Sequence, residues 1–253
     1  MTESFEKTKV AGSIAAGALD EVNNIIKPGV STSEIDKLCY EYINDHKAFS
    51  APLYYRGYPK SCCTSSNHVV CHGIPSEKIL NDGDILNVDV TAIKDGWHGD
   101  TSRMFVVGEC SVKAKKLIKT TYEAMMEAIK IIKANIKIGN IGYTIQKIVE
   151  AEGFSVVRDF CGHGIGKKFH ESPNVLHYGE KNSGQELKAG MIFTVEPMIN
   201  YGKFETKTLK DGWTAVTKDK SLSAQFEHTV GVTKEGYEIF TLSKKGLNFP
   251  PNL

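Results

Sequence analysis

Apolar residues recur every three to five positions near the start of the chain, which predicts an amphipathic helix. Its apolar face carries Val10, Ile14, Leu19, Val22 and Ile26. Pro28 and Gly29 would end it, because proline cannot continue a helix and glycine tolerates positive φ. The spacing of Ser31 and Glu34 is that of a capping box, so a second helix should begin there. Its apolar positions are Ile35, Leu38 and Tyr42.

A loop rich in Tyr, Pro and Ser is expected over residues 51–67, followed by a strand at 68–72. Residues 86–92 then alternate between apolar and polar side chains, the period of two that is typical of a strand. Asp95 and Gly96 follow, and Asp-Gly is a strong hairpin signal. The first half therefore predicts two helices and a β-hairpin.

The second half repeats this plan. A long amphipathic helix is predicted to end at residues 137–139, with a further helix after it. The long helix carries Leu117, Met125, Ile129, Ile132 and Ile136, and the second carries Ile141, Ile145, Ile148 and Val149. Residues 80–89 also align with 187–196, ending with Asp89 opposite Glu196. Matches in the same order predict an internal duplication of about 1–110 and 111–245 within one domain, 1–253.

Composition excludes several classes of protein. Of 253 residues, 41% are hydrophobic and 24% charged, and the net charge is +1, so neither disorder nor a DNA or membrane surface is indicated. The N-terminal segment has no apolar signal core, and no apolar run approaches the roughly 18 residues of a membrane span. The six cysteines form no CxxC pair and are predicted to be reduced and mostly buried. For Cys62 and Cys63, packing is favoured over lining a pocket. A cytoplasmic protein is expected.

Two carboxylates converge if Asp95 and Gly96 form a two-residue turn. Paired positions then sum to 95 + 96 = 191, which sets Asp89 opposite Ser102 and places Asp89 and Asp100 on one face, roughly 7–8 Å apart. Two acids at that distance repel each other unless a cation lies between them. A metal ion bonded to carboxylate oxygens would fit.

The duplication predicts a second pair, Glu196 and Glu227, with His163 and His170 among glycines between the two halves of the site. Any one of these residues alone is more often a solvated side chain, and the isolated histidines at 46, 98 and 177 are expected at the surface. Together the two pairs predict a di-metal site. Carboxylates with an imidazole suit Mn²⁺, Fe²⁺, Co²⁺ or Zn²⁺, and two such ions about 3.5–4 Å apart would activate water for hydrolysis.

A set of short motifs then identifies a family. They are HGIP (72–75), DV (89–90), HGDTS (98–102), CGHGIG (161–166), FHE (169–171), TVEPM (194–198) and FEHT (226–229). As a set they resemble type I methionine aminopeptidase over nearly the whole chain. The resemblance implies the α+β pita-bread fold, in which two pseudo-symmetric αβ halves surround a central antiparallel sheet and a dinuclear metal site.

The resemblance also implies roles. The metal ligands would be Asp89, Asp100, His163, Glu196 and Glu227, with Asp100 and Glu227 bridging and Glu196 as proton shuttle. His72 would contact the scissile nitrogen and His170 the carbonyl oxygen. The substrate pocket would consist of these two histidines with Tyr55, Tyr58, Cys63, Phe169 and Trp213. A monovalent cation, Na⁺ or K⁺, would lie at Asn67, Val69 and Ser223.

The implied activity is removal of the initiator methionine from nascent proteins whose second residue is small. Short spacers between the ligands, and a start close to the first helix, favour the short bacterial form, expected as a monomer. The family often has histidine where Arg56 stands. Lys113, Lys115 and Lys116 leave open a transient ribosome contact or, as the favoured alternative, a solvated helix face. Two rivals remain, a proline-directed or creatine-hydrolysing relative and a non-enzymatic scaffold.

Overall fold

The computed structural model describes residues 3–251 and 253, so positions 1–2 and 252 of the predicted 1–253 domain lie outside the described residues. The helices are α1 (Glu3–Ile25), α2 (Thr32–Asp45), α3 (Val112–Lys130) and α4 (Gly139–Ala151), with a 3-10 turn, η1, at Tyr55–Gly57. The strands are β1 (Phe49–Ser50), β2 (Cys63–Ser66), β3 (Val69–Cys71), β4 (Ile85–Lys94), β5 (Trp97–Val106), β6 (Ser155–Val156), β7 (Gly162–Gly164), β8 (Glu171–Val175), β9 (Ile192–Val195), β10 (Met198–Asn200), β11 (Thr206–Thr208), β12 (Ala215–Thr217), β13 (Ser223–Gln225), β14 (Glu227–Val232) and β15 (Tyr237–Ile239).

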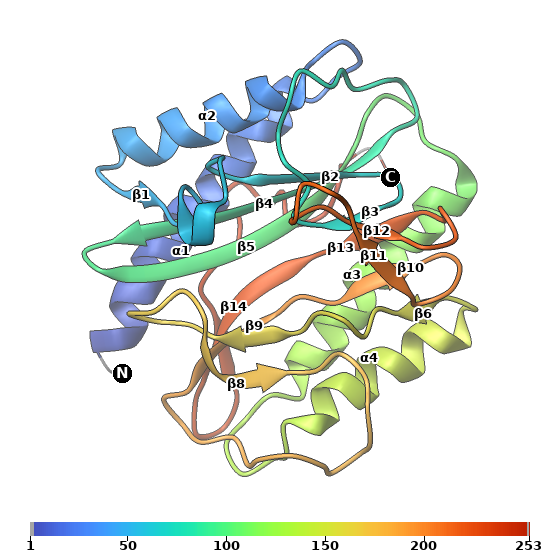
Figure 1. Ribbon diagram of the computed structural model, residues 1–253. Helices are drawn as coiled ribbons and strands as arrows, with labels where there is room; N and C mark the ends of the chain where they lie inside the picture. Colours follow the sequence, from blue (N-terminus) through green and yellow to red (C-terminus); the bar gives the residue numbers. More distant parts are fainter. Residues whose placement is uncertain (1–2, 252) are drawn as a thin grey trace.

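One antiparallel sheet organises the molecule. Its nine strands follow the order β1-β4-β5-β14-β9-β7-β8, with β2 paired to β4 and β15 to β14. Two three-stranded sheets, β13-β10-β6 and β11-β12-β3, flank it. Helix α1 packs on β4 and β5, while α3 packs on β10 and β13 and α4 on β6 and β8 (Figure 1). The α+β class with a central antiparallel sheet is as predicted.

The predicted hairpin is confirmed in register as well as in position. Asp89 pairs with Ser102 and Thr91 with Asp100. Asp95 and Gly96 have φ of 50° and 80°. Positive φ at both central residues is typical of the two-residue hairpin turn whose twist matches that of the flanking strands. The prediction of a loop over 51–67 is partly wrong, because β2 lies within it. All four residues of β2 are buried, so no alternation of polar and apolar residues marked the strand.

Helices α1, α2 and α4 confirm the predicted ones, and the capping box between Ser31 and Glu34 is present. Val10 was expected on the buried face of α1 but is 48% exposed. The long second-half helix was predicted too far, since α3 ends at Lys130. Beyond it, the backbone N–H of Asn135, with φ of 69°, donates to the carbonyl of Leu187 at 2.9 Å. Backbone hydrogen bonds to a distant part of the same chain therefore replace the helical ones beyond Lys130.

The two halves make matching backbone hydrogen bonds. The Leu80 carbonyl accepts from Gly29 N–H and its N–H donates to Val30, while Leu187 does the same with Asn135 and Ile136. One hydrophobic core lies under α1 and α2 and consists of first-half residues, and a second lies under α3 and α4 and consists mainly of second-half residues with Ile85, Met104 and Val106 of the first. The duplication remains a prediction, and these bonds support it.

The cysteines are free thiols, five of them buried and Cys161 half-buried. Cys62 packs in the core under α2, as predicted. Within the described part of the chain, none of the helices combines the length and apolarity needed to cross a bilayer.

Candidate metal centre

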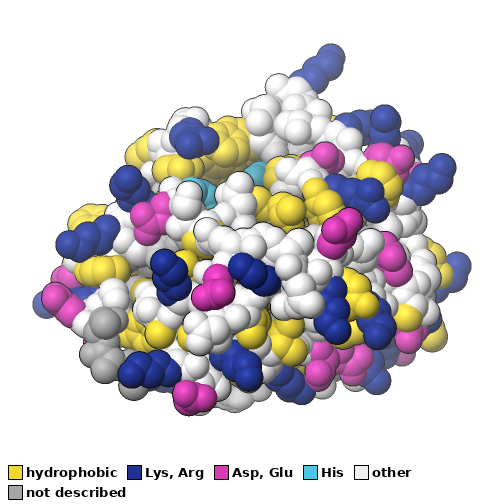
Figure 2. Space-filling view, turned by 90° about the horizontal axis from the view of Figure 1, so that it is seen from below, with side chains coloured by type: hydrophobic (Ala, Val, Ile, Leu, Met, Phe, Trp, Pro, Cys, Tyr) yellow, Lys and Arg dark blue, Asp and Glu magenta, His cyan; other side chains and the backbone are white. Residues whose placement is uncertain are grey.

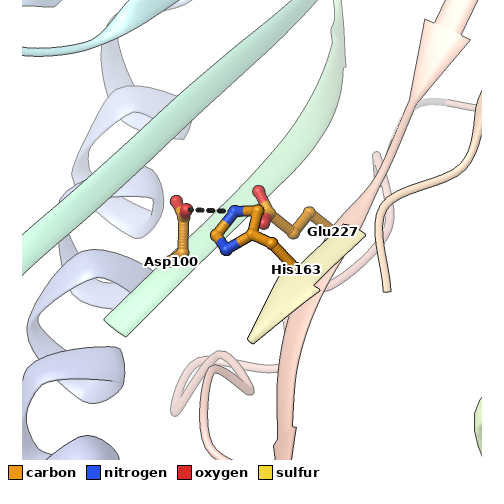
Figure 3. Close-up of side chains that lie close together, drawn as sticks. All are labelled: Asp100, His163 and Glu227. Carbon is orange, nitrogen blue, oxygen red and sulfur yellow. Dashed lines mark ion pairs between the residues drawn. The ribbon is translucent and has the colours of Figure 1, made fainter. Parts of the chain in front are cut away.

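Three side chains from separate strands meet at the centre of the sheet. Ligand atoms of Asp100 on β5, His163 on β7 and Glu227 on β14 all lie within 4.8 Å of one another, and all three residues are buried. Figure 3 shows the His163 ring lying between the two carboxylates. His163 Nε2 is 3.8 Å from Asp100 Oδ2 and 3.6 Å from Oε1 of Glu196. This spacing leaves room for an ion between the groups.

Sheet order explains why residues so far apart in sequence converge. Ser102 pairs with Asp89 on one side and with Glu227 on the other. Glu196 directly follows β9, whose last residue pairs with β14. The five predicted ligands thus come one each from the neighbouring strands β4, β5, β14, β9 and β7, Glu196 from the end of its strand. Asp89 and Glu196 line the same cavity as the three central ligands.

Glycines allow β7 to fit into this arrangement. A Cβ on Gly162 would lie 2.4 Å from the Thr194 carbonyl oxygen, and one on Gly164 would lie 2.2 Å from that of Ser172. No side chain could be accommodated against backbone at those distances. The close approach that the CGHGIG motif predicted is therefore a backbone requirement on both sides of His163.

The carboxylates of the site are not neutralised by the protein. Burial raises the pKa of Asp89 to about 7 and that of Glu196 to about 8. Burial together with neighbouring acids raises the pKa values of Asp100 and Glu227 well above the ordinary range. Among the described residues, no Lys or Arg forms an ion pair with any of them. Burial lowers the pKa of His163 to about 4, so its ring is neutral and can offer a lone pair.

Hydroxyl groups hold the ligands from behind. Thr91 Oγ1 donates to Asp100 Oδ1 at 2.6 Å, and Thr194 Oγ1 donates to Glu196 Oε1 at the same distance. The Thr194 oxygen also accepts from the backbone N–H of His163 at 2.9 Å, so one hydroxyl links two predicted ligands. Partners of this kind orient ligands around metal ions in proteins.

Two histidines expected at the surface are buried, and that prediction was wrong. His177 is 1% exposed, and its Nε2 accepts from the backbone N–H of Glu196 at 3.1 Å. Burial lowers its pKa to about 3, which keeps the ring neutral and able to accept. His98 is also buried and stacks on Phe169, with ring centroids 5.7 Å apart. Both burials arise from tertiary contacts that local pattern does not encode; His46 is exposed, as expected.

A cavity of about 380 Å³ opens beside the carboxylates. Figure 2 shows a face of the molecule on which histidine side chains are visible in a recess between hydrophobic groups. All seven predicted substrate residues line the cavity: Tyr55, Tyr58, Cys63, His72, Phe169, His170 and Trp213. Cys63, for which packing alone was favoured, is therefore part of the wall. The sequence gave no site role to Pro52, Thr91, Asp159 and Phe160, which also line the cavity. Cys161 and Met198, which belong to the CGHGIG and TVEPM motifs, complete the lining with Arg56.

Aromatic contacts set the shape of this cavity. Tyr58 meets Trp213 edge to face at 5.1 Å between centroids, and His72 meets Phe160 at 5.4 Å. At the other side, Tyr55 contacts Phe169 at 4.9 Å, and its hydroxyl lies 3.1 Å from Nδ1 of His170. Burial, then the charges of neighbouring groups, lowers the pKa of His170 to about 3.

The three residues expected around a monovalent cation lie away from the cavity lining. Ser223 N–H donates to the Asn67 carbonyl at 2.8 Å, and Val69 begins β3 two residues further on. Asn67 has φ of 56° and its side chain donates to Asp84 at 2.8 Å. A bound cation at this position remains a prediction.

Comparison with known proteins places the chain among metallopeptidases. Residues 6–234 match the sequence model of metallopeptidase family M24. Methionine aminopeptidase of Rickettsia prowazekii is 56% identical over 250 residues, covering 98% of this chain and 96% of that protein. Methionine aminopeptidase of Escherichia coli K12 is 56% identical over 244 residues, covering 96% and 92%.

Solved structures agree. The crystal structure of the Rickettsia prowazekii enzyme has a TM-score of 0.94 and covers 96% of this chain and 98% of its own. That of methionine aminopeptidase from Thermotoga maritima also has 0.94, at 40% identity, covering 95% and 97%. A prolidase from Pyrococcus furiosus, 22% identical with a TM-score of 0.77, covers 95% of this chain but 64% of its own, and shows the fold alone.

Proposed function

The chain belongs to metallopeptidase family M24, and from that premise we propose that it removes the N-terminal methionine of nascent proteins by metal-dependent hydrolysis. The resemblance and the pita-bread fold inferred from sequence are both confirmed. One observation carries the proposal furthest. Five ligand groups from five neighbouring strands, four of them buried and that of Asp89 half-buried, line a cavity whose walls are aromatic, apolar and thiol-bearing. Such walls suit the thioether of methionine.

The residues present fit divalent metal ions. Three buried carboxylates and the half-buried Asp89, without a basic partner, either keep protons or hold cations. The oxygen-rich set with one neutral imidazole is a donor set for Co, Mn, Fe or Zn. We propose that two ions would be held by these residues, with Asp100 and Glu227 serving both ions, His163 one and Asp89 the other. Glu196 would be a further ligand that doubles as the proton shuttle. Bound there, the ions would lower the pKa of a water molecule and polarise the scissile carbonyl.

Glu196 is proposed to move the proton. Its Oε1 accepts a hydrogen bond from the Thr194 hydroxyl, and its Oε2 lies 3.4 Å from Nε2 of Gln225. Its backbone N–H donates to His177, so the carboxylate has little freedom to turn away. A carboxylate held in this way would take a proton from the attacking water and pass it to the leaving nitrogen.

Two histidines, His72 and His170, would contact the scissile amide of the substrate. We assign the Tyr55 hydroxyl as donor to Nδ1 of His170, which leaves the ring proton on Nε2 to donate to the carbonyl oxygen. His72, with φ of 56°, would contact the scissile nitrogen. Tyr55, Phe169 and His170 crowd together with ring centroids 4.1–5.2 Å apart. This crowding supports a small second residue in the substrate.

The remaining assignments extend the proposal. A Na⁺ or K⁺ ion at Asn67, Val69 and Ser223 and a cytoplasmic monomer are proposed alongside it. For the lysines of α3, two observations favour a solvated helix face over a ribosome contact. Lys116 pairs with Glu152 at 2.9 Å, and the ammonium of Lys113 lies 5.7 Å from the Tyr201 ring centroid.

A peptide panel tests the function. Metal-free protein supplied in turn with Mn²⁺, Fe²⁺, Co²⁺ or Zn²⁺ should release methionine from Met-Ala-Ser much faster than from Met-Leu-Ser. Preference for X-Pro peptides would support the proline-directed relative. No release with any metal would support the non-enzymatic scaffold, and either result would contradict the proposal.

A further inference from the structure

Arg56 lies at the mouth of the cavity in an unusual backbone conformation. Its side chain is exposed and lines the cavity, and its φ is 48°. Left-handed backbone is uncommon for residues with a side chain and costs free energy, so it persists where the surroundings impose it. Here Tyr54 N–H donates to the Tyr58 carbonyl at 2.8 Å, and Gly57 N–H donates to Tyr54 at 3.2 Å. The turn that carries Arg56 is therefore closed and holds the side chain at the rim.

The neighbours of Arg56 show which part of a substrate it would meet. Its guanidinium carbon is 5.4 Å from the centroid of the Tyr55 ring, whose hydroxyl contacts His170. We place the methionine side chain of the substrate deeper in the cavity, where Tyr58 meets Trp213 and Cys63 is part of the wall, with Tyr55 between that pocket and the rim. Residues beyond the scissile bond would then leave past Tyr55 and Arg56. An extended peptide advances about 3.3–3.6 Å per residue, so the third and fourth residues would lie at this rim.

The charge of Arg56 is available to a ligand. Over the described residues, no carboxylate forms an ion pair with it, whereas nearby Lys60 lies 3.8 Å from Asp36. Asp159, the acidic residue exposed at the same cavity, accepts a hydrogen bond from Thr206. A guanidinium presents a planar fork of donors that matches a carboxylate.

We propose that Arg56 is a specificity-determining residue, which pairs with an acidic side chain at the third or fourth position of the substrate. This inference rests on the proposed aminopeptidase function. Because the pair would be exposed to solvent, its effect is modest, roughly two- to fivefold in kcat/KM, and salt weakens it.

Amidated peptides that differ at one position provide the test. The wild-type protein is compared on Met-Ala-Ser-Glu, Met-Ala-Ser-Gln and Met-Ala-Ser-Lys, and on the series with the variable residue in third place. The same peptides are given to Arg56→Gln and Arg56→Glu. Lys47→Gln is the matched control, since Lys47 is also an exposed cation, has φ of 52°, and does not line the cavity.

The wild-type protein and Lys47→Gln should favour Glu over Gln peptides by two- to fivefold at low ionic strength, and less at high salt. Arg56→Gln should lose the preference while retaining its rate on the Gln peptide, and Arg56→Glu should favour the Lys peptide. Absence of preference in the wild type, its survival in Arg56→Gln, or an equal loss on all peptides would overturn the inference. Failure of the wild type on every peptide would instead reject the proposed function.

Discussion

Strand β5 carries two buried charged side chains whose charges are handled in different ways. Arg103 is 2% exposed and forms an ion pair with Asp20 of α1, and it also donates to the Ala16 carbonyl at 3.1 Å. Asp100, three residues earlier, meets other acids and a neutral imidazole. Positions three apart on a strand point to opposite faces, so one charge lies under the helix and the other in the cavity.

The difference separates a structural group from a functional one. Burial of a charge is costly unless it is paired, and Arg103 has its partner within the chain. The carboxylate cluster of Asp89, Asp100, Glu196 and Glu227 has none, so its pKa values are raised. A cluster of carboxylates that no basic side chain of the protein neutralises is a candidate binding site for a cation.

The largest expected effect is on catalysis. Glu196→Gln should lower kcat for Met-Ala-Ser by 10²–10⁴, the usual contribution of a general acid–base group. The metal-free variant should be at least as stable as the parent, because a costly buried carboxylate is gone. Exposed Glu77→Gln is the control and should leave kcat within about twofold. An unchanged kcat in Glu196→Gln would remove the proton-shuttle assignment.

The structural pair should respond in the opposite way. Arg103→Met should lower the free energy of unfolding by about 3–5 kcal/mol, because Asp20 is left buried without its partner. Adding Asp20→Asn should recover much of that loss, and the folded fraction should keep its kcat/KM within about threefold. Urea denaturation with active-site titration measures both quantities. Equal instability of the single and double variants would argue against a buried pair.

The pH dependence of stability gives a smaller contrast. In the metal-free protein, Asp89 and Glu196 have folded pKa values near 7 and 8, above their unfolded values, so the folded state holds protons that the unfolded state has lost. Stability should therefore fall as pH rises to about 8. The buried histidines, with lowered pKa values, act in the opposite direction below about 6.5, so the comparison belongs between pH 6.5 and 8.

Saturating Mn²⁺ should abolish that fall, because bound ions replace the protons. Urea denaturation at intervals of half a pH unit, with and without the ion, measures the slope. Metal-free protein whose stability rises over this range would contradict the account of the cluster.

The hairpin shows how far local rules reach. The Asp-Gly turn alone predicts the pairing of β4 with β5, and hence the shared face of Asp89 and Asp100, and the structure has that pairing. The internal match of 80–89 with 187–196 likewise placed Glu196 correctly at the end of β9. Where a period and a turn type agree, sequence determines side-chain direction.

Long-range contacts account for what sequence could not predict. His177 and His98 have no local pattern that marks them as buried, and each is held by a backbone group distant in the chain. The end of α3 depends on backbone hydrogen bonds from residues 134 and 135 to the carbonyls of Thr233 and Leu187. No sequence signal for a helix end near Lys130 predicts them. The sequence shows that Arg56 stands where the family often has histidine, but its position at the rim of the cavity follows from the hydrogen-bonded turn around it.

Titration of the metal-free chain with Mn²⁺, followed by calorimetry and by methionine release in parallel, tests the central claim most directly. We expect two ions bound per chain and activity that appears only as they bind. Glu227→Gln, which alters a proposed bridging ligand, should lose both ions and the activity, whereas the control Glu77→Gln should behave as the parent. Binding of two ions by Glu227→Gln, or full activity of the parent without metal, would contradict the assignment of the carboxylate cluster as a dinuclear metal centre.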